Sequence, residues 1–174
     1  MADYKMVRYK RRVSVIIPKH EYFGLWVKED FVVNCPRYFR EGVTVLDVGC
    51  GNIGIKQCLP EGVTCIGVDK DPDCDPPPDI VCDVGSIPLE DKCADTITSL
   101  GFDVYRSPGA VSEIKRLLKD GGYFIFQGSR EYFYLSNTIG FLTDSGFNIE
   151  EEFRQVLRYP KVPLTFVYYI CKLR

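Results

Sequence analysis

The chain has 174 residues, of which 45% are hydrophobic and 26% charged, and its formal net charge is −2. These ordinary globular values argue against a disordered chain, and the length fits one domain. No apolar run approaches the ~20 residues of a membrane-spanning helix, and VSVIIP is too short for the core of a signal peptide. We therefore expect a cytoplasmic protein with no membrane segment.

Charge is distributed unevenly along the chain. Residues 1–40 carry nine Lys or Arg against four Asp or Glu, a net +5, whereas residues 41–103 carry three against thirteen, a net −10. The basic start, which includes RYKRR, is either an arm that attracts an anionic partner such as RNA or a solvated tail.

The eight cysteines form no C-x-x-C pair, and with a single histidine, His20, no familiar zinc spacing arises. No metal site is therefore expected. Several cysteines lie within apolar runs, where cysteine packs as a small hydrophobic residue. Cys58, Cys74 and Cys93, in less apolar surroundings, are the best candidates for reaction or pairing.

The first forty residues predict a short strand in VSVII and a helix over about 22–34. We interpret residues 1–40 as a basic and aromatic extension that packs on a domain formed by residues 41–174. The aromatic side chains of the predicted helix either cap the core or wall a substrate pocket. They are Tyr22, Phe23, Trp26 and Phe31.

From residue 43 onward, apolar β-rich runs alternate with loops and helical segments. The runs cover residues 43–49, 63–69, 79–84, 94–100 and 122–128. Their near-continuous apolarity indicates strands buried on both faces, as in a parallel sheet. Helices are predicted over 107–119 and about 130–144, each followed by glycine. The segment DKDPDCDPPPDI is too rich in Pro and Asp for a helix, so one crossover helix is missing or reduced to a loop.

The C-terminus predicts a different arrangement. FNIEEEFRQVLRYP and VPLTFVYYICKL are two extended segments whose connection is too short for a helical crossover, which indicates an antiparallel pair. The predicted fold class is therefore α/β, a Rossmann-like doubly wound sheet that is mostly parallel, with a C-terminal antiparallel hairpin and reduced helices.

The stretch VTVLDVGCGNIGIK carries Gly49, Gly51 and Gly54 at the G-x-G-x-x-G spacing of dinucleotide-binding loops. Glycines alone are a weak signal, because several cofactor folds share such a turn. Asp47 lies two residues before the first glycine, where its carboxylate would repel a pyrophosphate. Two further acids, Asp69 and Asp83, lie at the ends of the next two predicted strands.

Together the motifs VLDVGCGNIG, IGVDKDP, DIVCDVGSIPLED, ADTITSLGF and LLKDGGYFIFQG resemble the class I S-adenosylmethionine-dependent methyltransferases, of the methyltransferase type 11-like kind. The resemblance covers about residues 42–174 and follows the order and approximate spacing of that family. It implies a seven-stranded methyltransferase fold that ends in an antiparallel hairpin. It also implies S-adenosylmethionine as the cofactor.

The resemblance implies a role for each matching position. Asp47 would complement the ammonium of the methionine end, Asp69 would accept from both ribose hydroxyls, and Asp83 with the Val84 N–H would bind adenine. A carbonyl around residues 99–101 would bind the methionine amino group. The implied cofactor-binding residues are Asp47, Gly49, Cys50, Gly51, Asp69, Lys70, Asp83, Val84, Ser99 and Leu100.

The chain departs from the family at Ile53, where the family usually has glycine, and at Pro60, which shortens the helix after the loop. For catalysis the resemblance points to Asp103, Tyr105 and Arg106, which are otherwise surface loop residues. His20 is a candidate base if the N-terminal segment folds over the pocket, and otherwise a structural or exposed residue.

The Asn/Asp-Pro-Pro-Tyr/Phe motif of amino-group methylation is absent, and about forty residues are available to enclose an acceptor. So small an extension suits an open site, which together with the basic RYKRR arm favours an RNA or protein acceptor over a small molecule. Two alternatives stay open: a non-catalytic methyltransferase-like binding subunit and a nicotinamide oxidoreductase. The sequence also leaves open a partner subunit or a homodimer.

Overall fold

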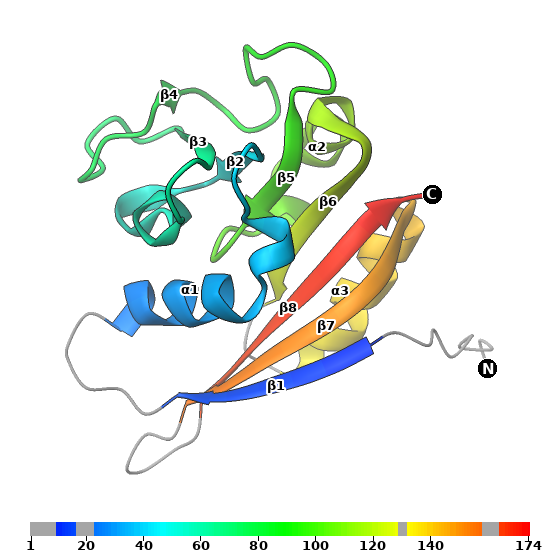
Figure 1. Cartoon of the computed structure of the whole chain (residues 1–174). Helices are drawn as coiled ribbons and strands as arrows, with labels where there is room; N and C mark the ends of the chain where they lie inside the picture. The colour runs from blue at the N-terminus through cyan, green and yellow to red at the C-terminus, as the bar shows by residue number, and fades with distance from the viewer. Residues whose placement is uncertain (1–9, 17–22, 129–131, 158–163) are drawn as a thin grey trace.

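The computed structural model describes residues 10–16, 23–128, 132–157 and 164–174 (Figure 1). The strands are β1 (Lys10–Ile16), β2 (Thr44–Val48), β3 (Thr64–Asp69), β4 (Ile80–Val81), β5 (Ala94–Ser99), β6 (Leu118–Gly128), β7 (Phe147–Leu157) and β8 (Leu164–Leu173). The helices are α1 (Phe23–Asn34), α2 (Ala110–Leu117) and α3 (Tyr132–Asp144). Short 3-10 turns are η1 (Pro36–Tyr38), η2 (Gly51–Ile53), η3 (Ile55–Cys58) and η4 (Val104–Arg106). No described helix is long and apolar enough to cross a membrane.

The strands form one sheet in the order β1-β7-β8-β6-β5-β2-β3-β4. Five of its seven pairings are parallel, and β8 runs antiparallel to both β6 and β7. This confirms the predicted doubly wound sheet with a C-terminal antiparallel hairpin. The strand predicted in VSVII is β1, which lies parallel to β7 at the edge and adds an eighth strand to the predicted seven.

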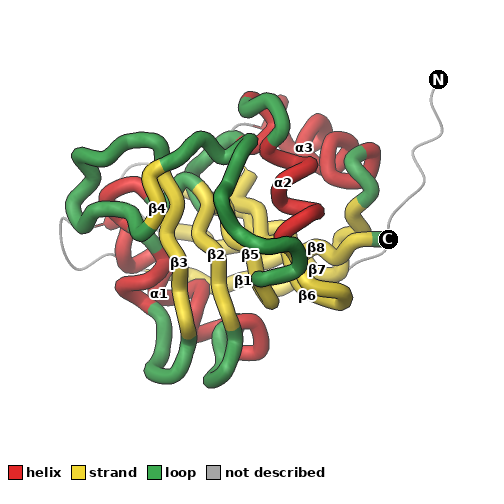
Figure 2. Tube along the Cα trace, turned by 90° about the horizontal axis from the view of Figure 1, so that it is seen from above, coloured by secondary structure: helices red, strands yellow, loops and turns green. Residues whose placement is uncertain are grey.

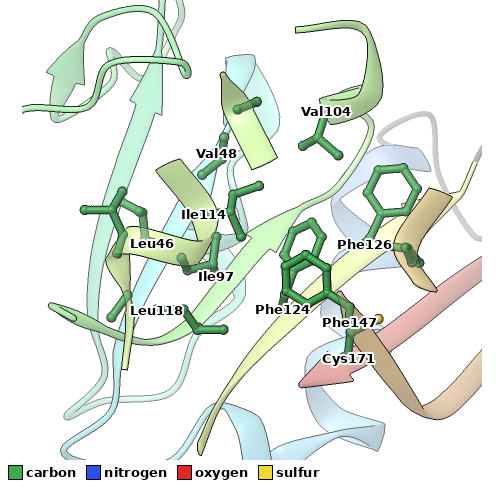
Figure 3. Close-up of a cluster of buried hydrophobic side chains, with 14 of the residues drawn as sticks. Leu46, Val48, Ile97, Val104, Ile114, Leu118, Phe124, Phe126, Phe147 and Cys171 are labelled. Atoms are coloured by element: carbon green, nitrogen blue, oxygen red, sulfur yellow. The ribbon is translucent and has the colours of Figure 1, made fainter. Parts of the chain in front are cut away.

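Helices cover both faces of the sheet, with α1 on one face and α2 and α3 on the other (Figures 1 and 2). Side chains of β6 alternate between the two cores, as the two-residue period of a strand requires. Phe124 and Phe126 join the core under α2 and α3, whereas Ile125 joins the core under α1. Figure 3 shows the first of these cores, in which Ile114 of α2 lies close to Ile97 of β5.

Aromatic packing fixes α1 on its face of the sheet. The Phe31 ring is fully buried and stacks on Tyr168 of β8, with 4.2 Å between ring centroids and 6° between ring planes. Phe31 therefore caps the core, which was one of the two interpretations of the helix. Tyr22 lies outside the described residues, and the side chains of Phe23 and Trp26 are not described.

The helical layer is reduced around β3 and β4, as the sequence predicts. Two 3-10 turns, η2 and η3, follow β2, and the second ends at Cys58, two residues before Pro60. No helix forms between β3 and β4, where the Pro- and Asp-rich segment runs. The carboxyl ends of β2, β3 and β5 are consequently covered by loops, and these loops form the site described below.

Another stretch without a helix, residues 85–91, is fixed by two side chains of α2. The Ile87 N–H donates to Glu113 Oε2 at 3.0 Å, and the Arg116 guanidinium donates to the carbonyl oxygens of Ile87 and Leu89 at 2.9 and 2.7 Å. Arg116 also binds Glu113 directly at 2.7 Å. These contacts fix the segment that directly follows Asp83 and Val84.

We expect Glu113→Ala to lower the free energy of unfolding by about 1–3 kcal/mol at neutral pH, because Arg116 and the Ile87 N–H each lose a partner. The hydrogen bond from Arg116 lowers the pKa of Glu113 below its usual 4.5. A depressed pKa stabilises the folded state above the unfolded-state value, and this stabilisation disappears as pH falls through the folded-state value. Urea denaturation at several pH values should therefore show a difference from wild type that shrinks below about pH 4.5.

The exposed Glu90 provides the matched control, and Glu90→Ala should stay close to wild type at every pH. An equal, pH-independent loss of stability in both variants would contradict the role given to Glu113.

Candidate functional site

The turn after β2 depends on two glycines with left-handed backbone conformations. Gly49 has φ 68° and Gly51 has φ 53°, a region that side chains other than glycine rarely adopt. The N–H groups of Gly49 and Cys50 both donate to the carbonyl oxygen of Val68 in β3, at 2.8 and 3.1 Å. The loop is thereby tied to the neighbouring strand end.

Gly54, which completes the dinucleotide-type spacing, has an ordinary φ of −65°. A Cβ there would lie 3.4 Å from Asp47 Oδ2, so this glycine lets the chain pass close to the carboxylate. Its role in this structure is thus close approach rather than a left-handed turn.

Asp47 is buried, with 1% of its surface exposed, and its carboxylate faces the protein. Its Oδ2 accepts from the Ile55 N–H at 2.8 Å, and its Oδ1 accepts from the Thr98 hydroxyl at 2.7 Å. Burial raises the pKa of Asp47, and the positive charge of Lys28 offsets part of that rise. Asp47 therefore holds the loop in place. Its predicted contact with a cofactor ammonium stays a prediction.

One cavity, of about 120 Å³, lies beside the loop at the carboxyl ends of β2 and β3. It is called the smaller cavity below. It brings together five of the residues predicted from sequence. These are Gly49, Asp69, Lys70, Asp83 and Val84, joined by Phe102 and Ser107.

The two acids of the smaller cavity also shape its loops. Asp69 Oδ2 accepts from the Gly51 N–H at 2.9 Å, and Asp83 Oδ1 accepts from the Gly85 N–H at 2.7 Å. Asp69 is half-buried and Asp83 is exposed. Each carboxylate oxygen can accept more than one hydrogen bond, so both acids can still bind ligand donors.

A larger cavity of about 390 Å³ adjoins the smaller one, since Gly49 lines both. Its wall consists of residues 49–53 of the loop, Leu100 and Gly101 after β5, and side chains from three other elements. The latter are Val27 and Lys28 of α1, Gln127 of β6 and Phe166 of β8. Cys50, Gly51 and Leu100, which were predicted from sequence, lie here. The predicted Ser99 lines neither cavity, and its buried hydroxyl donates to the Phe102 carbonyl at 2.9 Å.

Sequence reasoning did not single out Lys28, Gln127 or Phe166. Lys28 is only 9% exposed, and its ammonium donates to the carbonyl oxygen of Ile53. Ile53, the departure from the family pattern, is thus one of the residues after β2 that α1 contacts. A lysine in an amphipathic helix usually points to solvent, so nothing in the sequence marks this one as buried.

The predicted catalytic residues Asp103, Tyr105 and Arg106 lie in and beside η4, and none of them lines either cavity. Arg106 pairs with Asp103 at 3.4 Å, with most of the Arg106 side chain exposed. The Tyr105 ring packs edge-on against Phe126 and Phe141 of the core. Their role near a reacting methyl group stays a prediction, and His20 lies outside the described residues.

All eight cysteines are free thiols. Burial raises the pKa of Cys50 to about 12, so this cavity-lining thiol stays protonated at neutral pH. In the described part of the chain, no three His, Cys, Asp or Glu side chains gather in a way that could hold a metal ion.

Comparison with known proteins agrees with this geometry. Residues 46–126 match the family model of the methyltransferase domain. This segment runs from β2 to β6 and contains the loop, Asp69, Asp83 and the end of β5. Comparison with curated protein sequences finds no match.

Solved structures with the same fold include methyltransferases. An S-adenosylmethionine-dependent methyltransferase from Methanosarcina mazei superposes with a TM-score of 0.63 at 16% identity, covering 78% of this chain and 94% of its own. The Burkholderia thailandensis 1,6-didemethyltoxoflavin-N1-methyltransferase was solved with bound S-adenosylhomocysteine. It superposes with a TM-score of 0.67 at 15% sequence identity, and the match covers 86% of this chain and 78% of its own. A chain in the complex of the Haloferax volcanii Trm112 methyltransferase activator with a methyltransferase superposes with a TM-score of 0.57 at 17% sequence identity. The match covers 87% of this chain and 99% of that chain.

At these identities the solved structures establish the fold, and the family match establishes the domain. Residues 46–126 therefore match a methyltransferase domain, and the chain has the fold of S-adenosylmethionine-dependent methyltransferases.

Proposed function

We propose that the chain is an S-adenosylmethionine-dependent methyltransferase whose cofactor spans the two cavities. The observation that carries this proposal is that the cavities adjoin at Gly49, while the smaller one gathers Asp69, Asp83 and Val84. Adenosine would occupy the smaller cavity, with Asp69 on the ribose hydroxyls and Asp83 with the Val84 N–H on adenine. The methionine end would then enter the larger cavity.

The larger cavity suits methyl transfer because part of its wall is apolar. Methyl transfer from a sulfonium needs in-line approach of a nucleophile and exclusion of water. Val27, Leu100 and Phe166 would exclude water around the methyl group. The protein's contribution is then chiefly to orient cofactor and acceptor.

Cofactor binding is tested by thermal unfolding with S-adenosylhomocysteine. A ligand at about 100 times its Kd stabilises the fold by about 2.7 kcal/mol. For a domain of this size that corresponds to a rise in melting temperature of roughly 5–10 °C. NAD⁺ at the same concentration should cause no shift. A shift with NAD⁺ and none with S-adenosylhomocysteine would overturn the proposal in favour of the oxidoreductase alternative.

We propose further that the acceptor is RNA or protein rather than a small molecule. The net charge of +5 in residues 1–40 supports a macromolecular partner with anionic groups. Of the described residues in this stretch, β1 joins the sheet and α1 caps one core. When the chain is incubated with methyl-labelled cofactor and fractionated cell extract, label should enter macromolecules. Nuclease or protease should then release that label. Label confined to small molecules would contradict this part.

The second candidate function is a non-catalytic, cofactor-binding subunit of a larger assembly or of a homodimer. It is favoured by one observation, that Asp103, Tyr105 and Arg106 line neither cavity. It predicts a melting-temperature shift with S-adenosylhomocysteine but no transfer of label.

Finally, we propose a cytoplasmic location, since eight free thiols are typical of a reducing compartment.

A further inference from the structure

The uneven charge of the sequence is also uneven in space. Asp69 ends β3 beside the smaller cavity, and the exposed acids Asp71, Asp73 and Asp75 follow it. Basic side chains gather instead at the amino ends of the parallel strands, where β6 begins and the antiparallel β8 ends. Acidic and basic groups thus lie at opposite ends of the strands.

A further cavity of about 180 Å³ lies at the amino ends of β5 and β6, and we call it the basic cavity. Its wall includes Arg37 and Arg40 from the turn after α1 and Lys119 from the start of β6. It shares no lining residue with the larger or the smaller cavity. The basic cavity is therefore separate from the proposed cofactor site.

The two acids that line the basic cavity are already paired with protein donors. Asp95 Oδ2 accepts from the Lys119 ammonium at 2.8 Å and from the Thr44 N–H at 2.9 Å. Asp120 pairs with Lys92 at 2.8 Å. An ammonium has three donors, so Lys119 can still bind an anion that enters the cavity.

The two arginines of the basic cavity also have donors to offer. Arg37 pairs with the buried Glu151 of β7 at 2.6 Å through one terminal nitrogen, and its side chain is 54% exposed. The Arg40 side chain is exposed and forms no hydrogen bond or ion pair within the described residues. A guanidinium has five N–H donors in a planar fork that matches two phosphate oxygens. Both arginines can therefore bind a phosphate group.

Aromatic rings hold two of the cations in place. The Tyr38 and Tyr123 rings meet edge-on, with their centroids 4.7 Å apart. The Arg37 guanidinium lies 4.6 Å from the Tyr38 centroid, and the Lys172 ammonium of β8 lies 4.7 Å from the Tyr123 centroid. The cavity is open at Gly121, where nothing lies within 4 Å of an added Cβ. The cations are thus positioned beside space that a ligand can enter.

From this arrangement we infer that the basic cavity binds phosphate groups of RNA through Arg37, Arg40 and Lys119. RNA is favoured over a single phosphorylated group because the basic residues continue beyond the cavity. β1 begins with the sequence KRR, and its first residue pairs in register with Glu151, which Arg37 contacts. A series of cations suits a chain of phosphates. The inference rests on the proposed function only in naming RNA among the proposed acceptors, since this site does not require the cofactor.

The test measures binding of a short, labelled single-stranded RNA of mixed sequence by fluorescence anisotropy, without cofactor and at several salt concentrations. Arg40→Gln and Lys119→Gln should each raise the Kd about 3–10-fold, and the double variant about 10–100-fold. Each substitution should also lower the slope of log Kd against log salt by about 0.7, as expected for one lost phosphate contact on a single strand. If Lys119→Gln does not fold, Arg40→Gln alone carries the test.

Lys56→Gln is the matched control. Lys56 pairs with Asp79 at 2.7 Å, much as Lys119 pairs with Asp95 at 2.8 Å, and both pairs are similarly exposed. Lys56 does not line the basic cavity, so the same loss of charge should leave the Kd within about twofold of wild type.

Three results overturn the inference: no binding of RNA by wild type, equal weakening by Lys56→Gln and the cavity variants, or unchanged binding in the cavity variants. Polyglutamate that displaces the RNA at equal charge concentration also overturns it, because the surface then takes an acidic protein. All of these results leave the proposed cofactor untouched. Conversely, a wild-type chain that binds RNA but not S-adenosylhomocysteine contradicts the cofactor and supports the basic cavity as an RNA site.

Discussion

Asp69→Ala should weaken binding of S-adenosylhomocysteine at least about 100-fold, because two ribose hydroxyls lose a charged acceptor worth roughly 1.5–3 kcal/mol per hydrogen bond. Asp69 lies in the smaller cavity with Asp83 and Val84, where the proposed adenosine would bind. Titration calorimetry gives the Kd directly. The effect should appear equally with 5′-methylthioadenosine, since the ribose is common to both ligands.

Asp69 also accepts from the Gly51 N–H, so its removal loosens the loop as well. Asp69→Asn separates the two roles, because its amide oxygen can still accept from Gly51 while the charge is gone. The exposed Asp71, whose N–H donates to Asp69, provides the control, and Asp71→Ala should bind within about threefold of wild type. Wild-type affinity in both Asp69 variants would exclude this residue from the site.

Gly49→Ala is expected to cause the largest loss of stability, about 3–5 kcal/mol in urea denaturation. A Cβ at this position would lie 2.5 Å from Cγ and 2.6 Å from Cβ of Phe102, at a left-handed φ of 68°. Both contacted atoms are close to the Phe102 backbone, so the ring cannot simply rotate away. Phe102 also lines the smaller cavity, and its displacement should reduce cofactor affinity.

Gly51→Ala is the matched control for backbone strain without a clash. Its φ of 53° is also left-handed, but nothing lies within 4 Å of an added Cβ. We expect a loss of about 1–2 kcal/mol, the cost of the backbone conformation alone. Equal losses in the two variants would show that the contact with Phe102 is not what requires glycine at position 49.

The sequence predicted most strands because residues buried on both faces of a parallel sheet produce apolar runs. It also predicted that Asp69 ends a strand, whereas Asp83, predicted at the end of the next strand, lies two residues beyond the short β4. Parallel strands bring such ends to one edge of the sheet. The strand in VSVII was predicted too, but its pairing with residues 151–157 was not. That pairing joins segments almost the whole chain apart, and no local pattern specifies it.

The predictions were weakest where a side chain's direction depends on tertiary packing. Asp47 is buried against Ile55 and Thr98, contacts that the sequence did not indicate, and its contact with a cofactor ammonium stays a prediction. Lys28 could not be found, because its burial requires α1 to lie against the loop that ends at Ile53. The Tyr105 ring packs against Phe126 and Phe141, which the sequence did not indicate, and its role near the methyl group stays a prediction.

The most direct test of the proposed methyltransferase activity uses S-adenosylmethionine labelled either in the methyl group or in the carboxyl group. The purified chain is incubated with each cofactor in cell extract, and macromolecules are separated from the free cofactor. We predict that label from the methyl group enters RNA or protein, that label from the carboxyl group does not, and that Asp69→Ala strongly reduces the transfer. A wild-type chain that binds S-adenosylhomocysteine but transfers neither label would contradict the enzymatic activity.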